Sequence, residues 1–241
     1  MAIAINSLYT HKHGYDLVVE RSPPDSTRAW APDHSRTSGS MNFSFSKPWV
    51  LLRQLYTHDV VLYLDSDAYF RNFSRTLEEF MEEHMSDWEG AEGGEGLDER
   101  GRDGQGVAHL PEMIMTWNCF SKAGCWTQRS SVNAGVLLFK STPRTIDFME
   151  QWALRPDTSG CAFLYEHYDQ ACLLDLTADD KYKWLIKRLD QEHASAMQLR
   201  DGVFITHLVG MGQQEREEAM MEALAAAYSD ELGLKVTIQR T

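Results

Sequence analysis

Two aspartates, Asp65 and Asp67, directly follow the apolar run Val60–Leu64 and have the types and spacing for chemistry. The run shows no polar alternation, which predicts a strand covered on both faces, as in a parallel α/β sheet. Side chains at positions i and i+2 of an extended chain share a face, so both carboxylates can converge beyond the strand's end, where such sheets bind ligands. Their oxygens favour Mg²⁺ or Mn²⁺ over zinc. A polar turn or a helix cap is the structural alternative.

Composition and charge narrow the class of protein that carries this pair. Of 241 residues, 43% are hydrophobic and 24% are charged, which is typical of an ordinary globular domain. A formal net charge of −13 argues against nucleic acid or an anionic membrane as partner, because both would be repelled. A small phosphorylated ligand held through a metal ion stays compatible, since the cation reverses the local field. No apolar run reaches the length of a membrane span.

Cysteine spacing bears on zinc and on disulfides. The four cysteines form no C-x-x-C pair, which argues against a structural zinc site. Their even number permits disulfides without requiring them. They are Cys119, Cys125, Cys161 and Cys172.

Alternating helix and strand patterns indicate how the aspartates are positioned. We expect a helix to end near Gly14, one to have Pro48 in its first turn, and one to be capped by Ser74. The helices are predicted at 2–15, 47–58, 74–85, 142–154, 165–177 and 213–232, and the strands at 15–20, 60–64, 109–120, 130–141 and 202–212. Residues 181–190 fit an amphipathic strand or a helix. A long loop is expected over 22–46, and a mobile insertion over the Gly- and Glu-rich residues 89–106.

Six short segments stand in one order along the chain: HGYDLVV, KPWVLLRQL, VVLYLDSDAYFRN, SVNAGVLLFKS, HYDQACLLDL and ITHLVG. Together they resemble the nucleotide-sugar glycosyltransferases of the GT-A fold, most closely the galactosyl/xylosyltransferase family of yeast mannan and plant xyloglucan enzymes. The resemblance covers roughly residues 5–212, and the length of the chain predicts one domain over residues 1–241. The resemblance also implies a Rossmann-like, mixed but mainly parallel sheet flanked by helices.

The resemblance assigns a metal site and an activity. It implies that Asp65, Asp67 and His207, the last in THLVG, hold Mn²⁺ (or Mg²⁺) against the diphosphate of a UDP- or GDP-sugar. The metal would neutralise charge that develops on the departing nucleoside diphosphate. The sugar would pass to a glycan hydroxyl, with retention of anomeric configuration.

Further residues match motifs that face the donor in that family. The pair Asp169–Gln170 corresponds to the acid and amide beside the reacting sugar. Asn133, Ala134 and Gly135 correspond to the sugar-contacting entrance of a strand, where an amide can bind hydroxyls and glycine admits close backbone approach. The structural alternative for the Asn133–Gly135 segment is a tight turn that needs glycine. For Asp169 and Gln170 it is a pair on the surface of a helix. Additional donor contacts are implied for Lys47, Ser66 and Gly210.

Two departures from the family pattern bear on function. The sequence opens within the helix that carries HGY, so the first strand of the family is expected to be missing. Beyond His207 the stretch VGMGQQEREE shows acids where the family has a basic residue for the diphosphate. A non-catalytic carbohydrate- or partner-binding domain derived from such an enzyme is therefore the alternative function. The resemblance places the chain in the Golgi lumen, although the sequence shows no targeting signal.

Overall fold

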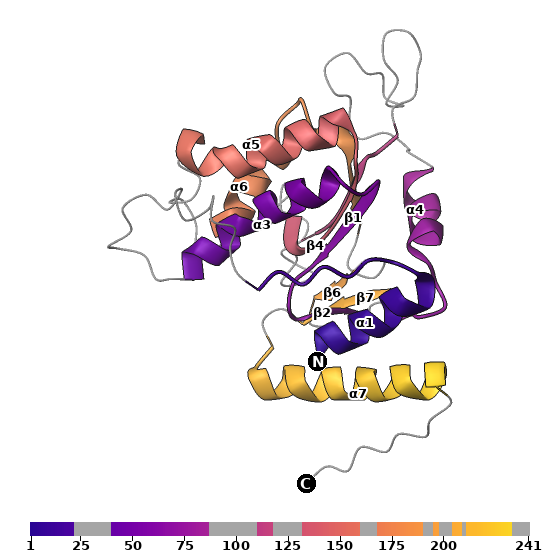
Figure 1. Cartoon of the computed structure of the whole chain (residues 1–241). Helices are drawn as coiled ribbons and strands as arrows, with labels where there is room; N and C mark the ends of the chain where they lie inside the picture. Colours follow the sequence, from indigo (N-terminus) through magenta and orange to yellow (C-terminus); the bar gives the residue numbers. More distant parts are fainter. Residues whose placement is uncertain are drawn as a thin grey trace.

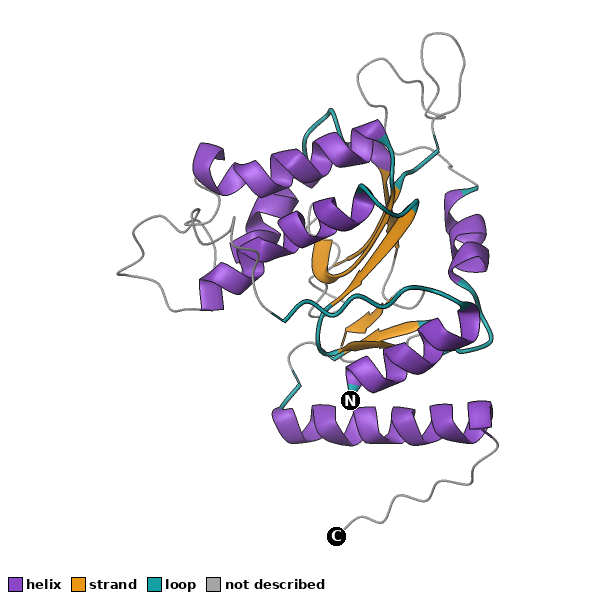
Figure 2. Ribbon diagram, viewed as in Figure 1, coloured by secondary structure: helices purple, strands orange, loops and turns teal. Residues whose placement is uncertain are grey.

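The computed structural model describes residues 1–21, 40–86, 110–117, 132–159, 168–189, 195–197, 204–208 and 211–232. Within these residues two small β-sheets are flanked by helices on both sides (Figures 1 and 2). No helix in these ranges combines the length and the apolar character needed to cross a bilayer. The expected insertion at 89–106 lies outside the described residues.

The larger sheet has four strands in the order β1-β4-β3-β5. They are β1 (Val60–Leu64), β4 (Val132–Lys140), β3 (Met113–Trp117) and β5 (Ile186–Leu189). β4 pairs antiparallel with both β1 and β3, whereas β3 and β5 are parallel. The expected mixed sheet is thus present, but the parallel setting predicted for β1 is wrong. A continuous apolar run reports burial on two faces and carries no information about the direction of its neighbour.

The smaller sheet has the order β2-β7-β6, with β2 (Ala68–Phe70), β7 (Ile205–His207) and β6 (Ser195–Met197). β2 is antiparallel to β7, and β6 is parallel to β7. Three of the five pairings in the described ranges are therefore antiparallel, so these strands are not mainly parallel as expected. The segment between β1 and β2 joins the two sheets, and it is the segment that contains Asp65 and Asp67.

Two hydrophobic clusters cover the two sides of the larger sheet. One cluster lies under α3 (Ser40–Leu55), α5 (Pro143–Ser159) and α6 (Tyr168–Thr177). The other joins α1 (Ala2–His13), α4 (Leu77–Met85) and α7 (Gln213–Leu232) to β2 and β7. Successive residues of β1 enter the two clusters in turn, as strand alternation requires: Val61 and Tyr63 face the first, and Val60, Leu62 and Leu64 the second.

The segment that follows α1 corrects one expectation. The helix ends as predicted at Gly14, whose φ of 73° is the left-handed conformation that glycine adopts readily. Residues 15–20, predicted as a strand, form a loop, and Leu17, Val18 and Val19 are exposed. An apolar β-branched run is compatible with a strand, but a strand also needs a neighbour for its backbone hydrogen bonds. No strand precedes β1 in the described part of the chain.

Helix boundaries differ from the sequence prediction in two places. α3 begins at Ser40, so Pro48 lies inside the helix and not in its first turn, and residues 40–46 are helical where a loop was expected. α4 is capped by Thr76, not Ser74, because Thr76 and Glu79 form a reciprocal capping box. The ambiguous segment 181–190 contains a short 3-10 helix (Lys183–Leu185) that leads directly into β5.

Candidate functional site

Pairing between β2 and β7 brings His207 to the two aspartates. Ala68, the residue after Asp67, is the register partner of His207. The Nε2 atom of His207 lies 3.1 Å from Asp67 Oδ1 and 3.7 Å from Asp65 Oδ2. One potential ligand atom from each of the three residues lies within 4.8 Å of the others. Residues about 140 positions apart therefore form one cluster at the junction of the two sheets.

Gly135 of β4 makes room for this cluster. Its carbonyl accepts a hydrogen bond from the backbone N–H of Asp65 at 2.8 Å. A Cβ atom at position 135 would lie 2.0 Å from His207 Cε1 and 2.7 Å from Asp65 Oδ2, which is too close for any real side chain. The sequence predicted close approach at Gly135, and the groups that approach it here are the candidate metal ligands themselves.

Lys47 of α3 connects the cluster to a second acidic residue. Its Nζ donates to the carbonyl of Ala134 at 2.9 Å and lies 3.0 Å from Asp169 Oδ2 and 3.5 Å from Asp65 Oδ1. Burial by itself would lower the pKa of Lys47, but Asp169, Tyr63 and Asp65 outweigh it and raise the pKa above its ordinary value. The ammonium group therefore stays charged, with one hydrogen bond to a carbonyl and two carboxylates within ion-pair distance.

Asp169 and Gln170 begin α6 beside Lys47. Burial raises the pKa of Asp169, and the ammonium of Lys47 opposes that shift. Gln170 Oε1 accepts from the backbone N–H of Ala134 at 3.1 Å, so the amide is anchored to the strand that carries Gly135. The indole of the buried Trp152 donates to the carbonyl of Asp169 at 3.0 Å. Trp152 thus serves the core and holds the start of α6 in place.

The other predicted substrate contacts have different surroundings. Asn133 is buried, and its Oδ1 accepts from the backbone N–H of Gly135 at 2.7 Å, so this oxygen shapes the strand locally. Ser66 is exposed in the turn between β1 and β2. Gly210 lies outside the described residues. The structure therefore brings Lys47, Asp169, Gln170 and the Asn133–Gly135 segment to the aspartates, with Ser66 at their solvent side.

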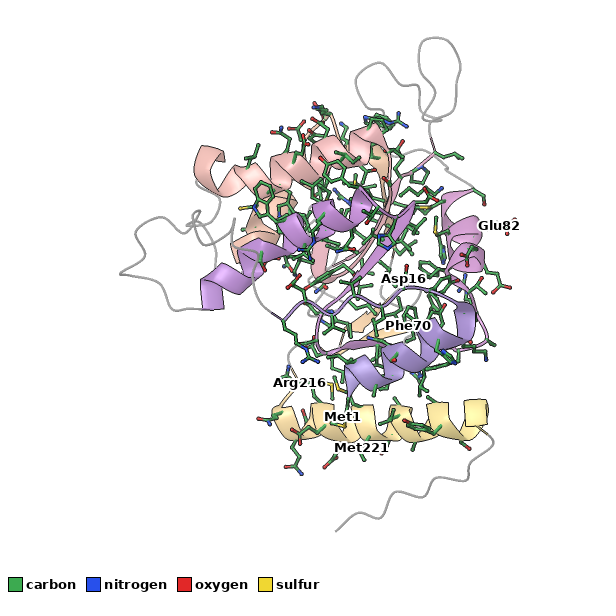
Figure 3. All side chains as sticks on the ribbon, in the orientation of Figure 1. Met1, Asp16, Phe70, Glu82, Arg216 and Met221 are labelled. Atoms are coloured by element: carbon green, nitrogen blue, oxygen red, sulfur yellow. The ribbon has the colours of Figure 1, made fainter. Side chains whose placement is uncertain are left out.

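Arg216 is a site residue that the sequence did not reveal. It lies in the first turn of α7, and its Nη1 is 3.2 Å from Asp67 Oδ2 (Figure 3). Burial would raise the pKa of Asp67, but His207 and Arg216 together lower it below its usual value. The sequence shows acids beyond His207 where the family has a basic residue, and Arg216, within that same stretch, is a basic residue beside Asp67. The only signal was one arginine at the start of a helix rich in Gln and Glu, and such a residue is usually a solvated surface charge.

The cluster fits a divalent cation on three observations. Two carboxylates and an imidazole form a mixed oxygen and nitrogen donor set that suits Mn²⁺. His207 is 1% exposed, and its Nδ1 has no hydrogen-bond partner within the described ranges. A buried polar atom without a partner is costly and rare in native proteins. The absence of a side chain at Gly135 lets the imidazole of His207 and the carboxylate of Asp65 lie together against the backbone of β4.

Comparisons with known proteins bear on the fold. No family model matches the sequence, and no curated protein matches it. Among solved structures, the chain resembles a glycosyltransferase involved in the glycosylation of the major capsid of PBCV-1. The TM-score is 0.58 at 14% identity, over 92% of this chain and 90% of the other. The protein therefore has a glycosyltransferase fold: a central mixed sheet flanked by helices.

Proposed function

We propose that this chain is a metal-dependent glycosyltransferase that moves a sugar from a nucleotide diphosphate sugar to a glycan hydroxyl. The observation that carries the proposal is the convergence of Asp65, Asp67 and His207 at a sheet junction within a glycosyltransferase fold. The ordered motifs of the galactosyl/xylosyltransferase type support the finer assignment, with a UDP- or GDP-sugar as donor and a glycan as acceptor.

The donor diphosphate requires a cation, because the chain carries a net charge of −13 and the site itself contains two carboxylates. Mn²⁺ or Mg²⁺ bound by Asp65, Asp67 and His207 would neutralise charge on the departing nucleoside diphosphate. Arg216 supplies a second positive group on the solvent side of Asp67, since its side chain is 39% exposed. Its guanidinium can bind phosphate oxygens while it keeps Asp67 ionised.

The transferred sugar is assigned to the side of the site that contains Asp169 and Gln170. Gln170 has its oxygen anchored to Ala134 N–H, so its amide nitrogen is the group that can donate to a sugar hydroxyl. Lys47 acts in this proposal by holding Asp169 and Asp65, because its ammonium already faces three protein oxygens. Asn133, Ala134, Gly135, Ser66 and Gly210 complete the proposed donor surroundings.

Retention of anomeric configuration is part of the proposal. An inverting enzyme needs a side chain free to deprotonate the acceptor hydroxyl. Asp169 is the buried carboxylate available beside the cluster, and it is paired with Lys47 at 3.0 Å. Proton NMR of the freshly formed product will show the retained anomer, and an inverted linkage would refute this assignment of Asp169.

The Golgi lumen is the proposed location. Cys172 on α6 is disulfide-bonded and fully buried, and disulfides persist in oxidising compartments. Co-localisation of the tagged protein with Golgi markers tests this point, and a cytosolic distribution would contradict it.

Thermal unfolding with a panel of nucleoside diphosphates, with and without Mn²⁺, tests the function. A ligand that binds only the folded chain raises its stability by mass action, so one nucleotide should stabilise it only when Mn²⁺ is present. Asp65→Asn and Asp67→Asn should each abolish that stabilisation. Asp147→Asn, a change at an acid of α5 outside the site, should leave it intact. Glycan binding that ignores both Mn²⁺ and nucleotides would instead identify a non-catalytic carbohydrate-binding domain.

A further inference from the structure

The two oxygens of Asp65 have different neighbours. Tyr63 donates its hydroxyl proton to Oδ1 at 2.7 Å, and Lys47 Nζ lies 3.5 Å from the same oxygen. Oδ2 lies 3.7 Å from His207 Nε2, on the side of the carboxylate that packs over Gly135. One oxygen is therefore held by the protein and the other faces the cluster.

Strand geometry explains why Tyr63 reaches Asp65. Residues two apart on an extended chain share a face, and Tyr63 lies two positions before Asp65 at the end of β1. The ring of Tyr63 packs in the hydrophobic cluster with Val61 and Trp49. The ring alone would serve this packing, so a phenylalanine would be sufficient if packing were the only requirement. The hydroxyl is the part that packing does not explain.

The Tyr63 hydroxyl is the donor of this pair, because a phenol O–H carries the proton and a carboxylate oxygen accepts it. The position of the Tyr63 ring is restrained as well. Lys47 Nζ lies 4.9 Å from the centre of the same ring, a cation–π distance that restrains the ring's position.

We propose that Tyr63 is a positioning residue of the metal centre, which fixes the Asp65 carboxylate so that Oδ2 is presented to the cation. This inference rests on the proposed metal-dependent function. Groups that hydrogen-bond to metal ligands orient them and tune their basicity, and losing one typically costs about 10- to 100-fold in metal affinity. Asp67 has no equivalent phenol in the described residues; its neighbours are His207 and Arg216.

The test is the Mn²⁺ affinity of Tyr63→Phe, measured from the electron paramagnetic resonance signal of free Mn²⁺. This substitution keeps the ring and removes only the hydroxyl. We expect affinity to fall by about 10- to 100-fold, with circular dichroism unchanged. Tyr182→Phe is the matched control, because Tyr182 packs in the same hydrophobic cluster as Tyr63 and also donates to an aspartate. Its hydroxyl lies 2.7 Å from Asp147 Oδ2, and Asp147 is not part of the metal cluster. This control should leave Mn²⁺ affinity unchanged.

The outcomes separate this inference from the function on which it rests. Wild-type protein that fails to bind Mn²⁺ would overturn both. Wild-type binding that Tyr63→Phe leaves intact would overturn the role of Tyr63 alone. Equal losses of conformational stability in Tyr63→Phe and Tyr182→Phe, without any loss of Mn²⁺ affinity, would show that the hydroxyl has only a structural role.

Discussion

The two aspartates of the site are held by different parts of the molecule. Asp65 is held by Tyr63 and by Lys47, both of which belong to the side covered by α3, α5 and α6. Asp67 is held by His207 of β7 and Arg216 of α7, on the side covered by α1 and α7. The Lys47 side chain is 10% exposed, whereas that of Arg216 is 39% exposed. Water can therefore replace Arg216 beside Asp67, but it has little access to Lys47 beside Asp65 or to His207, which is 1% exposed, beside Asp67.

The largest effect is expected from Lys47→Met, which keeps the length of the chain and removes its charge. The buried Asp169 and its neighbour Asp65 would then lose their common counter-charge. Breaking a buried ion pair in this way typically costs about 3–5 kcal/mol. Urea unfolding measures the loss. Lys181→Met is the control, since Lys181 is 60% exposed beside Asp147 and should cost about 1 kcal/mol or less. Equal losses for the two variants would show that the buried position of Lys47 adds nothing to the cost of losing its charge.

Gly135→Ala should produce the next largest effect, because it disturbs Asp65 and the His207 partner of Asp67 at once. The added methyl would require His207 and Asp65 to move, because it would lie 2.0 Å from the imidazole and 2.7 Å from the carboxylate. We expect Mn²⁺ affinity to fall by about 100-fold, equivalent to about 2.7 kcal/mol. Gly212→Ala is the control, because its added Cβ meets only Glu215 at an ordinary 3.7 Å. Isothermal titration of Mn²⁺ into both variants decides the point, and wild-type affinity in Gly135→Ala would contradict it.

Asn6→Ala tests how α1 supports the side of Asp67. Asn6 Nδ2 donates to the carbonyl of Ala68 at 3.0 Å, and Asn6 Oδ1 accepts from the N–H of Phe70 at 3.1 Å. Removing the amide leaves two groups of β2 unpaired in a buried region, so we expect a loss of about 2 kcal/mol. Guanidinium unfolding measures it. Asn72→Ala, at an amide that bonds only locally to Ser74, should cost less than about 1 kcal/mol. A cost for Asn6→Ala no greater than that of the control would show that α1 does not support β2.

The smallest effect on stability is expected from Arg216→Ala. An ion pair this exposed contributes about 0–1 kcal/mol, so the melting temperature should barely change. Affinity for the stabilising nucleoside diphosphate in Mn²⁺ should nevertheless fall by about tenfold, as for a lost charged hydrogen bond. Arg53→Ala, which removes an exposed ion pair with Glu20, should change neither quantity. Unchanged nucleotide affinity in Arg216→Ala would show that Arg216 does not bind the phosphates.

Helices were the elements that the sequence predicted best, because helical periodicity and capping are local. Gly14 ends α1 as expected, and the segment Gln213–Leu232 forms one helix. Strands were predicted less reliably, since a strand depends on a partner distant in sequence. The runs 15–20 and Val60–Leu64 both contain Tyr, Leu and Val, yet within the described residues only the second pairs with another strand, β4. The start of α3 was predicted too late because proline prefers the first turn of a helix. That preference does not prevent the helix from beginning earlier, at Ser40.

The candidate site was predictable to different degrees. Asp65 and Asp67 stood out because they end an apolar strand at i and i+2 spacing, and the order of motifs favoured a metal site over a polar turn or a helix cap. His207 was assigned only through the order of motifs, since by itself a histidine at a strand end is unremarkable. Arg216 and Tyr63 were missed as site residues. In the sequence Arg216 looks like a surface charge and Tyr63 like a core aromatic. Their roles follow from their contacts with Asp67 and Asp65, which only the structure shows.

The sequence by itself determined where most helices form and where an apolar strand ends in two carboxylates. These properties depend on local periodicity and local spacing, which need no knowledge of distant neighbours. The tertiary structure decided the direction of β1 and the approach of His207 to Asp67. It also decided that Tyr63 and Lys47 contact one oxygen of Asp65 while the other oxygen faces the cluster. Such contacts act over a few ångströms between residues far apart in sequence, so they exist only once the two sheets and their helices have packed.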